Sequence, residues 1–166
     1  MDGARERGRY GHRDATMILV AYIDMDCERQ SCVRCDGIKL IFGRGLLHVR
    51  RVKNGTPSGH PLGGTELRSL RRLMREQPES RHVFTTERRA PMSPEGFRKL
   101  VARIGEQAEF AFPVHPHMLR HACGYKLAND GQDTRALQHY LGHKNIMHTV
   151  RYTELSPERF KNFWED

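Results

Sequence analysis

Apolar residues recur with helical spacing along most of this chain, and the first such stretch lies near the N-terminus. Residues 9–22 carry enough apolar side chains for a buried helix, which we expect to begin at Asp14 or just before it. A second helix is predicted after Thr65, because apolar residues there lie three and four positions apart and arginines lie between them. Its apolar positions are Leu67, Leu70, Leu73 and Met74.

The second half of the chain contains side-chain signals for helix ends. Ser93 followed by Pro94 supplies an N-cap and a first-turn proline ahead of an apolar stripe. Pro116 opens another helix, which we expect to close at Gly131, and Asp133 is predicted to cap a shorter one. These signals predict three consecutive helices.

Strand patterns are fewer and shorter. Residues 45–52 are predicted to form one arm of a β-hairpin that returns through Gly-His-Pro-Leu-Gly, because Asn54-Gly55 supplies the positive backbone angles of a tight turn. Lys53 is then expected at or beside the hairpin tip. A further short strand is predicted at residues 82–86.

Together these elements predict an α+β fold that is mainly α, with a small antiparallel sheet or hairpin packed on a helical core. A last helix is expected after Ser156. The chain has 166 residues, 37% of them hydrophobic, which suffices for one domain with its own core. We expect that domain to span residues 9–166 with no second domain.

The charge of the chain indicates a polyanionic partner. The formal net charge is +8, and lysines and arginines placed on phosphates release condensed counterions, so double-stranded DNA is the leading candidate. A basic but merely solvated surface is the alternative. The chain has no long apolar run for a membrane span and no secretory signal at its N-terminus, so a cytoplasmic location is expected.

Polar residues near the C-terminus have the composition of a phosphodiester-cleaving centre. The phenolic oxygen of Tyr152 can attack phosphorus if cations neutralise the phosphate and an acid protonates the departing sugar oxygen. His117 and Arg120 are three residues apart and share a helix face, so both can converge on one phosphate. His143 follows Gly142 at a helix end, and Lys53 is a further candidate donor.

Other residues of the same types are given structural roles. Tyr140 lies in an apolar stripe, so we expect it to pack in the core. His121 follows Arg120 directly and is expected to turn toward a neighbouring face. His139 and His148 are expected to be surface or packing residues.

Residues 113–164 resemble the C-terminal half of the tyrosine recombinases of the phage integrase family, especially the branch that inverts fimbrial promoter segments. The resemblance is carried by the strings HPHMLRHACGYKLANDG, TRALQHYLGHKNIMHTVRYT and SPERFKNFW. It is specific because HxLRH, LGH and TxxYT occur in the family's order and spacing. Type IB topoisomerases share the chemistry, but the first string favours a recombinase.

The resemblance implies a role for each candidate residue. Tyr152 would be the nucleophile that forms a 3′-phosphotyrosyl link, and Arg120 the second catalytic arginine. His117 would assist proton transfer or orientation, and His143 would hydrogen-bond the scissile phosphate. Lys53 would protonate the leaving 5′ oxygen. The scheme needs no metal and no cofactor, and the family acts as a homotetramer on DNA after binding through an N-terminal domain that we expect this chain to lack.

The chain departs from the family in residues 23–42. The family has a further arginine near here, in a pattern like LRxSE, whereas residues 23–41 read IDMDCERQSCVRCDGIKLI and have neither helical nor alternating periodicity. We expect impaired cleavage, lowered stability and disorder around residues 24–40. The alternative function is a non-catalytic DNA-binding remnant of a recombinase.

A compensated frameshift is the hypothesis that we prefer for this segment. With suitable third bases, the codons for residues 23–42 read from the last base of the Ile23 codon yield RHGLRASELCALRWDQVDF, which restores the LRxSE pattern. The other explanation is a metal or iron–sulfur site, because Cys27, Cys32 and Cys35 have a ligand-like spacing and His48 or Cys123 are candidate fourth ligands.

Overall fold

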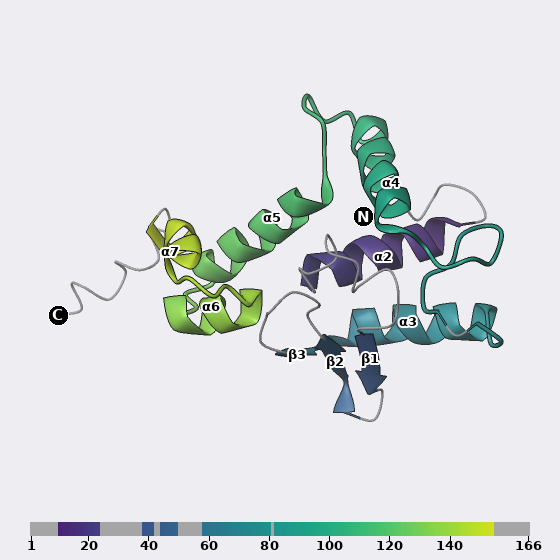
Figure 1. Ribbon diagram of the computed structural model, residues 1–166, viewed down its shortest axis with the longest axis horizontal. Coiled ribbons are helices and arrows are strands. Elements are labelled where there is room, and N and C mark those ends of the chain that lie inside the picture. Colours follow the sequence, from purple (N-terminus) through teal and green to yellow (C-terminus); the bar gives the residue numbers. More distant parts are fainter. Residues whose placement is uncertain (1–9, 24–37, 42–43, 50–57, 81, 155–166) are drawn as a thin grey trace.

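The computed structural model describes residues 10–23, 38–41, 44–49, 58–80 and 82–154. The predicted hairpin tip at Lys53, the predicted last helix after Ser156 and most of the cysteine-rich segment lie outside these residues. The described residues form a mainly helical structure with one small sheet, as expected from the sequence (Figure 1). Its elements, in chain order, are α2 (Gly11–Ile23), β1 (Ile38–Ile41), β2 (Leu46–Val49), β3 (Ser58–Pro61), α3 (Gly64–Glu76), α4 (Pro94–Gln107), α5 (Pro116–Asn129), α6 (Thr134–Leu141) and α7 (Met147–Glu154).

The sheet is antiparallel with the strand order β1-β2-β3. Leu47 of β2 lies opposite His60 of β3, which confirms the predicted hairpin. On its other edge Leu47 lies opposite Leu40 of β1. The expectation of disorder up to residue 40 is therefore wrong for its last residues, because Ile38–Ile41 form strand β1 and pair with β2.

The first helix begins earlier than the sequence suggested. It starts at Gly11, so Asp14 lies in its first turn and is not the cap. The Asp14 carboxylate instead pairs with the guanidinium of Arg13, with a shortest contact of 2.6 Å, and both side chains are largely buried. The Arg13 guanidinium also donates to the carbonyl oxygen of Thr85 at 2.9 Å, which ties α2 to the segment before α4.

The strand predicted at residues 82–86 does not form. The segment makes an isolated antiparallel bridge between Thr85 and Pro91, closed by a turn in which Arg89 has a φ of 57°. The bridge is held by hydrogen bonds from the Thr86 amide to the Ala90 carbonyl oxygen at 2.7 Å and from the Met92 amide to the Phe84 carbonyl oxygen at 3.1 Å, and the pairing does not extend beyond it. Phe84, which is 2% exposed, still packs into the core.

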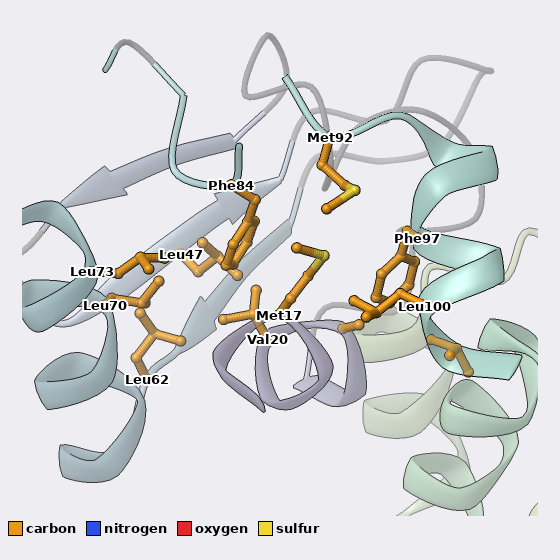
Figure 2. Packing of buried hydrophobic residues seen from close by; sticks show 12 residues of the cluster. Met17, Val20, Leu47, Leu62, Leu70, Leu73, Phe84, Met92, Phe97 and Leu100 are labelled. Carbon is orange, nitrogen blue, oxygen red and sulfur yellow. The ribbon is translucent and has the colours of Figure 1, made fainter. Parts of the chain in front are cut away.

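The main core lies between α2, the sheet, α3 and α4. Figure 2 shows Met17 and Val20 of α2 directed between Leu47 of the sheet on one side and Phe97 of α4 on the other. Burial of such side chains stabilises by roughly 1.5–3 kcal/mol each. No described helix has the length and apolar character needed to span a bilayer.

A second, smaller core joins α5, α6 and α7. Its buried members are Cys123, Ala128, Leu137, Leu141 and Tyr152. In Figure 1 these three helices gather at the end of the molecule away from α3 and α4, and α2 contacts α5 between the two groups. The predicted site residues of the C-terminal half all lie on or beside this smaller core.

Candidate active site

Local side-chain chemistry fixes the ends of the helices around the site. Pro116 occupies the first turn of α5, and the Asp133 carboxylate accepts hydrogen bonds from the backbone amides of Arg135 and Ala136, as predicted for the α6 cap. Gly142 ends α6 in the left-handed region with a φ of 67°, which favours glycine. The chain therefore turns sharply and brings the next residue, a histidine, back over the helix bundle.

Tyr152 is buried between α5 and α7. Its side chain is 2% exposed, and its ring lies flat against α5 because position 124 is a glycine. The Tyr125 ring meets it edge-on, with centroids 5.0 Å apart. Burial raises the pKa of the Tyr152 phenol, and the positive charges of Arg120 and Arg151 oppose this rise.

The Tyr152 hydroxyl forms a hydrogen bond with His121. The phenolic oxygen lies 2.8 Å from Nδ1 of that imidazole. The expectation that His121 faces away from the site is therefore wrong. The sequence carried a signal that was not used: His117 and His121 are four residues apart, so they share one face of α5.

The two α5 histidines contact each other. The rings of His117 and His121 lie edge to face, with centroids 4.4 Å apart, and His117 also neighbours His115 at 6.4 Å. Burial lowers the pKa of His121, and nearby positive charge from His117, Arg151 and Arg120 lowers it further. Both effects favour the neutral imidazole of His121.

Arg120 links α5 to the end of α6. Its guanidinium donates to the carbonyl oxygen of Leu141 at 2.6 Å, which holds the side chain beside the turn at Gly142. The guanidinium lies close enough to Tyr152 for its charge to lower the phenol's pKa. Arg120 thus supplies a cation next to the phenol, and its planar fork suits phosphate oxygens.

His143, which follows the turn at Gly142, lies beside the Tyr152 ring. Its ring is nearly parallel to that of Tyr152, with an interplanar angle of 13° and centroids 6.2 Å apart. Its Nδ1 lies 2.8 Å from the hydroxyl oxygen of Thr149, a fully buried residue of α7. The backbone carbonyl of His143 accepts from the Gln138 side chain at 3.0 Å, which fixes the turn.

The structure thus brings four of the five predicted site residues into one neighbourhood, where His117 reaches Tyr152 through His121. Lys53 lies outside the described residues, and Leu46–Val49 and Ser58–Pro61 are the strands on either side of it. Tyr140 packs against the smaller core and meets the His60 ring edge-on at 4.5 Å, as expected of a packing residue.

The remaining histidines match their expected roles, because His139 and His148 are exposed, although the His148 ring lies 5.9 Å from that of His143. In the part of the chain that the structure describes, no group of three or more histidine, cysteine or acidic side chains is placed to hold a metal ion. The arrangement offers a phenol, imidazoles and a guanidinium, which is the chemistry of nucleophilic attack on a phosphodiester.

Comparisons with known proteins give the same family as the sequence motifs. Residues 33–159 match the sequence profile of the phage integrase family. The type 1 fimbriae regulatory protein FimB of Escherichia coli K12 is 40% identical over 168 residues, covering 98% of this chain and 83% of that protein. The type 1 fimbriae regulatory protein FimE of the same strain is 38% identical over 171 residues, covering 95% and 82%.

Solved structures share the fold at lower sequence identity. The XerH recombinase bound to its palindromic difH substrate superposes with a TM-score of 0.74 at 16% identity, over 96% of this chain and 48% of that one. The XerA recombinase gives a TM-score of 0.68 at 18% identity, over 93% and 64%. The chain thus spans about half to two thirds of these recombinases. It belongs to the phage integrase family of tyrosine recombinases and has the fold of their catalytic domain.

Proposed function

We propose that this chain cleaves and rejoins double-stranded DNA at specific sites, with Tyr152 as the nucleophile that forms a 3′-phosphotyrosyl intermediate. The observation that carries the proposal is the neighbourhood of the phenol: its hydroxyl bonds an imidazole, a second imidazole is stacked on its ring, and a guanidinium lies beside it. A buried tyrosine with only a packing role needs one hydrogen-bond partner and no such cluster.

We propose that several polar side chains together stabilise the transition state. Arg120 is held beside the turn by its hydrogen bond to the Leu141 carbonyl oxygen, and a planar guanidinium is suited to binding two phosphate oxygens. His143, fixed by Thr149, is proposed to donate to the scissile phosphate, and His117 to assist orientation or proton transfer. Preorganised donors of this kind act where the pentacovalent phosphate gathers negative charge.

Lys53 is proposed as the acid that protonates the leaving 5′ oxygen. The support is its place in the sequence, between two strands that pair as an antiparallel hairpin. An ammonium on a hairpin tip can reach a DNA backbone at a distance from the rest of the site. The scheme uses no metal and no cofactor, because the phosphotyrosine conserves the energy of the bond that breaks.

Double-stranded DNA is the proposed partner. The net charge of +8 favours a polyanion, and the related XerH recombinase and Tn1549 transposon integrase were solved bound to DNA. We propose assembly as a homotetramer on two DNA duplexes, as in the family, and action in the cytoplasm, where bacterial DNA resides.

Residues 23–42 bear on how active this chain is. They lack the LRxSE pattern in which the family carries its first arginine, and loss of one preorganised donor costs on the order of a hundred- to thousand-fold in rate. We propose slow cleavage by this sequence and a compensated frameshift as the origin of the segment. Sequencing the encoding locus tests that origin, because codons incompatible with RHGLRASELCALRWDQVDF in the shifted frame would exclude it.

A trapping experiment separates a recombinase from a DNA-binding remnant. The protein is incubated with duplexes that carry a nick beside a randomised sequence, so that the cleaved strand diffuses away and the enzyme stays covalently attached. We expect a detergent-resistant adduct that is lost in Tyr152→Phe and retained in Tyr140→Phe, a matched control in the same small core. Salt-sensitive binding with no adduct would favour the remnant and overturn the proposed activity.

A further inference from the structure

We propose that His121 is a further catalytic residue, the base that accepts the hydroxyl proton of Tyr152 as the phenol attacks phosphorus. The inference rests on the proposed function and deepens it, because neither the motif roles nor the comparisons assign a task to this histidine. Nδ1 of His121 lies 2.8 Å from the phenolic oxygen, within the range of direct proton transfer.

The geometry favours His121 over the other imidazoles. The ring of His143 is stacked on the phenol at 13°, and its Nδ1 already bonds the Thr149 hydroxyl. His117 contacts the ring of His121 edge to face, one turn earlier on α5. Of these three, His121 is the one that the structure places in a hydrogen bond with the phenol.

The electrostatic surroundings fit a base. A phenol whose pKa is raised by burial ionises too rarely near neutral pH to attack unaided, so it needs a proton acceptor. The pKa of His121 is lowered, so this imidazole keeps an unprotonated nitrogen at pH 7. The titratable and charged groups that act on the pair from α5 and its N-cap, from α7 and from the turn between α6 and α7 are His115, His117, Arg120, Cys123, Tyr125, His143 and Arg151.

The step balances in atoms and charge. The bond from the Tyr152 oxygen to phosphorus forms, the bond from phosphorus to the 5′ oxygen breaks, and the tyrosyl proton moves to Nδ1 of His121. The departing 5′ oxygen takes a proton from the separate acid proposed above. In rejoining, a 5′ hydroxyl attacks the phosphotyrosine and gives its proton to the deprotonated form of that separate acid. The imidazolium returns its proton to the departing phenolic oxygen, so both His121 and the acid are regenerated.

The mechanism requires one tautomer of His121, with hydrogen on Nε2 and a lone pair on Nδ1. Nitrogen-15 NMR of the full chain, free of DNA, distinguishes the two tautomers from the imidazole shifts. We expect unprotonated Nδ1 near pH 7, and a rise in the His121 pKa in Tyr152→Phe, because the phenol's hydrogen bond stabilises the neutral ring. Hydrogen on Nδ1 would overturn the proposal, because that nitrogen would then donate to the phenol.

The rate of covalent adduct formation gives a second, kinetic test of the role of His121. His121→Asn keeps a polar acceptor near the Nδ1 position but cannot take up a proton. We expect adduct formation to slow about a hundred-fold, the lower range for general base catalysis, and to lose its dependence on deprotonation of a group with a pKa below 6.5. His139→Asn, at an exposed position of α6, is the matched control and should react at the wild-type rate.

The outcomes separate this inference from the proposed function. Adduct formation by His121→Asn at the wild-type rate, with an unchanged pH profile, would show that His121 only packs or positions and would overturn its role as base. Absence of any adduct from the wild-type chain would refute the proposed function. In that case the tautomer measurement still decides whether Nδ1 can accept the phenol's proton.

Discussion

Gly124→Ala is expected to displace the nucleophile without unfolding the protein. A Cβ at position 124 of α5 would lie 3.0 Å from Cε1 and from Cζ of the Tyr152 ring, and 3.1 Å from Cδ1. Carbon atoms in good contact lie about 3.5–4.0 Å apart, so the ring must move by roughly 0.5 Å or more. Tyr152 is buried in the smaller core, so it moves together with α7 or by tilting within its pocket.

The two effects of this substitution on stability oppose each other. Alanine stabilises a helix by about 1 kcal/mol relative to glycine, whereas overpacking a core costs about 1–3 kcal/mol. The free energy of unfolding should therefore change by between zero and about 2 kcal/mol. The phenol starts 2.8 Å from Nδ1 of His121, and a 1 Å misplacement of a reacting group costs about a hundred-fold, so a shift of about half that size predicts a loss of about tenfold.

Adduct formation with the nicked duplexes and urea denaturation together test this expectation. Gly64→Ala is the control, because a Cβ there meets the tip of the flexible Arg68 side chain, and α3 is far from the site. The control should keep the wild-type rate. A Gly124→Ala protein as fast as wild type would refute the close packing of the phenol on α5, and a loss of stability well above 3 kcal/mol would show that the ring cannot yield.

Three further predictions concern buried or partly buried groups. Asp14→Ala leaves the Arg13 guanidinium buried without its carboxylate and should lower the free energy of unfolding by about 3 kcal/mol in urea titrations; a loss under about 1 kcal/mol would contradict the buried pair. The folded-state pKa of His121 is lowered from 6.5, so its contribution to stability is present above pH 6.5 and is lost as the pH falls through the folded value. The free energy of unfolding of His121→Asn should therefore fall less steeply below pH 6.5 than that of the wild type. The same pH dependence in both proteins would argue against the lowered pKa of His121. Burial raises the pKa of Cys123 to about 11, so in a variant with serine at the three cysteines of residues 27–35 iodoacetamide should react at pH 8 only after unfolding; fast labelling of the folded protein would contradict its burial.

The helices that the sequence predicted well are those whose ends are set by local side chains. The Ser93 hydroxyl accepts from the amide of Gly96 at the start of α4, and Asp133 caps α6 in the same way. Such contacts span three residues, so a short stretch of sequence contains both partners. The pairing of β2 with β3 could also be predicted from the sequence, because the two strands are close in the chain and the turn-forming pair Asn54-Gly55 lies between them in the sequence.

The features that the sequence missed depend on partners far apart in the chain. Aspartate is a common N-cap residue, but Asp14 lies inside α2. There it is buried in an ion pair with Arg13, whose guanidinium also donates to the distant Thr85 carbonyl oxygen. Residues 82–86 have strand propensity, but their pairing is limited to the isolated bridge between Thr85 and Pro91. Local sequence propensity does not reveal such distant ion-pair, hydrogen-bond or strand partners.

In the candidate site too, the features set by neighbouring residues were predicted from the sequence, and a contact between distant residues was missed. The motifs predicted four residues that the fold brings together, because the helix face shared by His117 and Arg120 is a local property. The hydrogen bond between His121 and Tyr152 joins residues 31 positions apart, and it needs the left-handed turn at Gly142 to bring α7 onto α5. The directions of the His121 and Tyr152 side chains where α7 packs on α5 could be known only from the structure.

The central claim is that the phenol of Tyr152 becomes covalently bonded to DNA, and mass spectrometry of the trapped complex tests it most directly. After nuclease and protease digestion, the account predicts that the peptide containing Tyr152 carries a nucleotide, linked through the 3′ phosphate to the tyrosine oxygen. A nucleotide on another residue, or a 5′ linkage at this tyrosine, would contradict it.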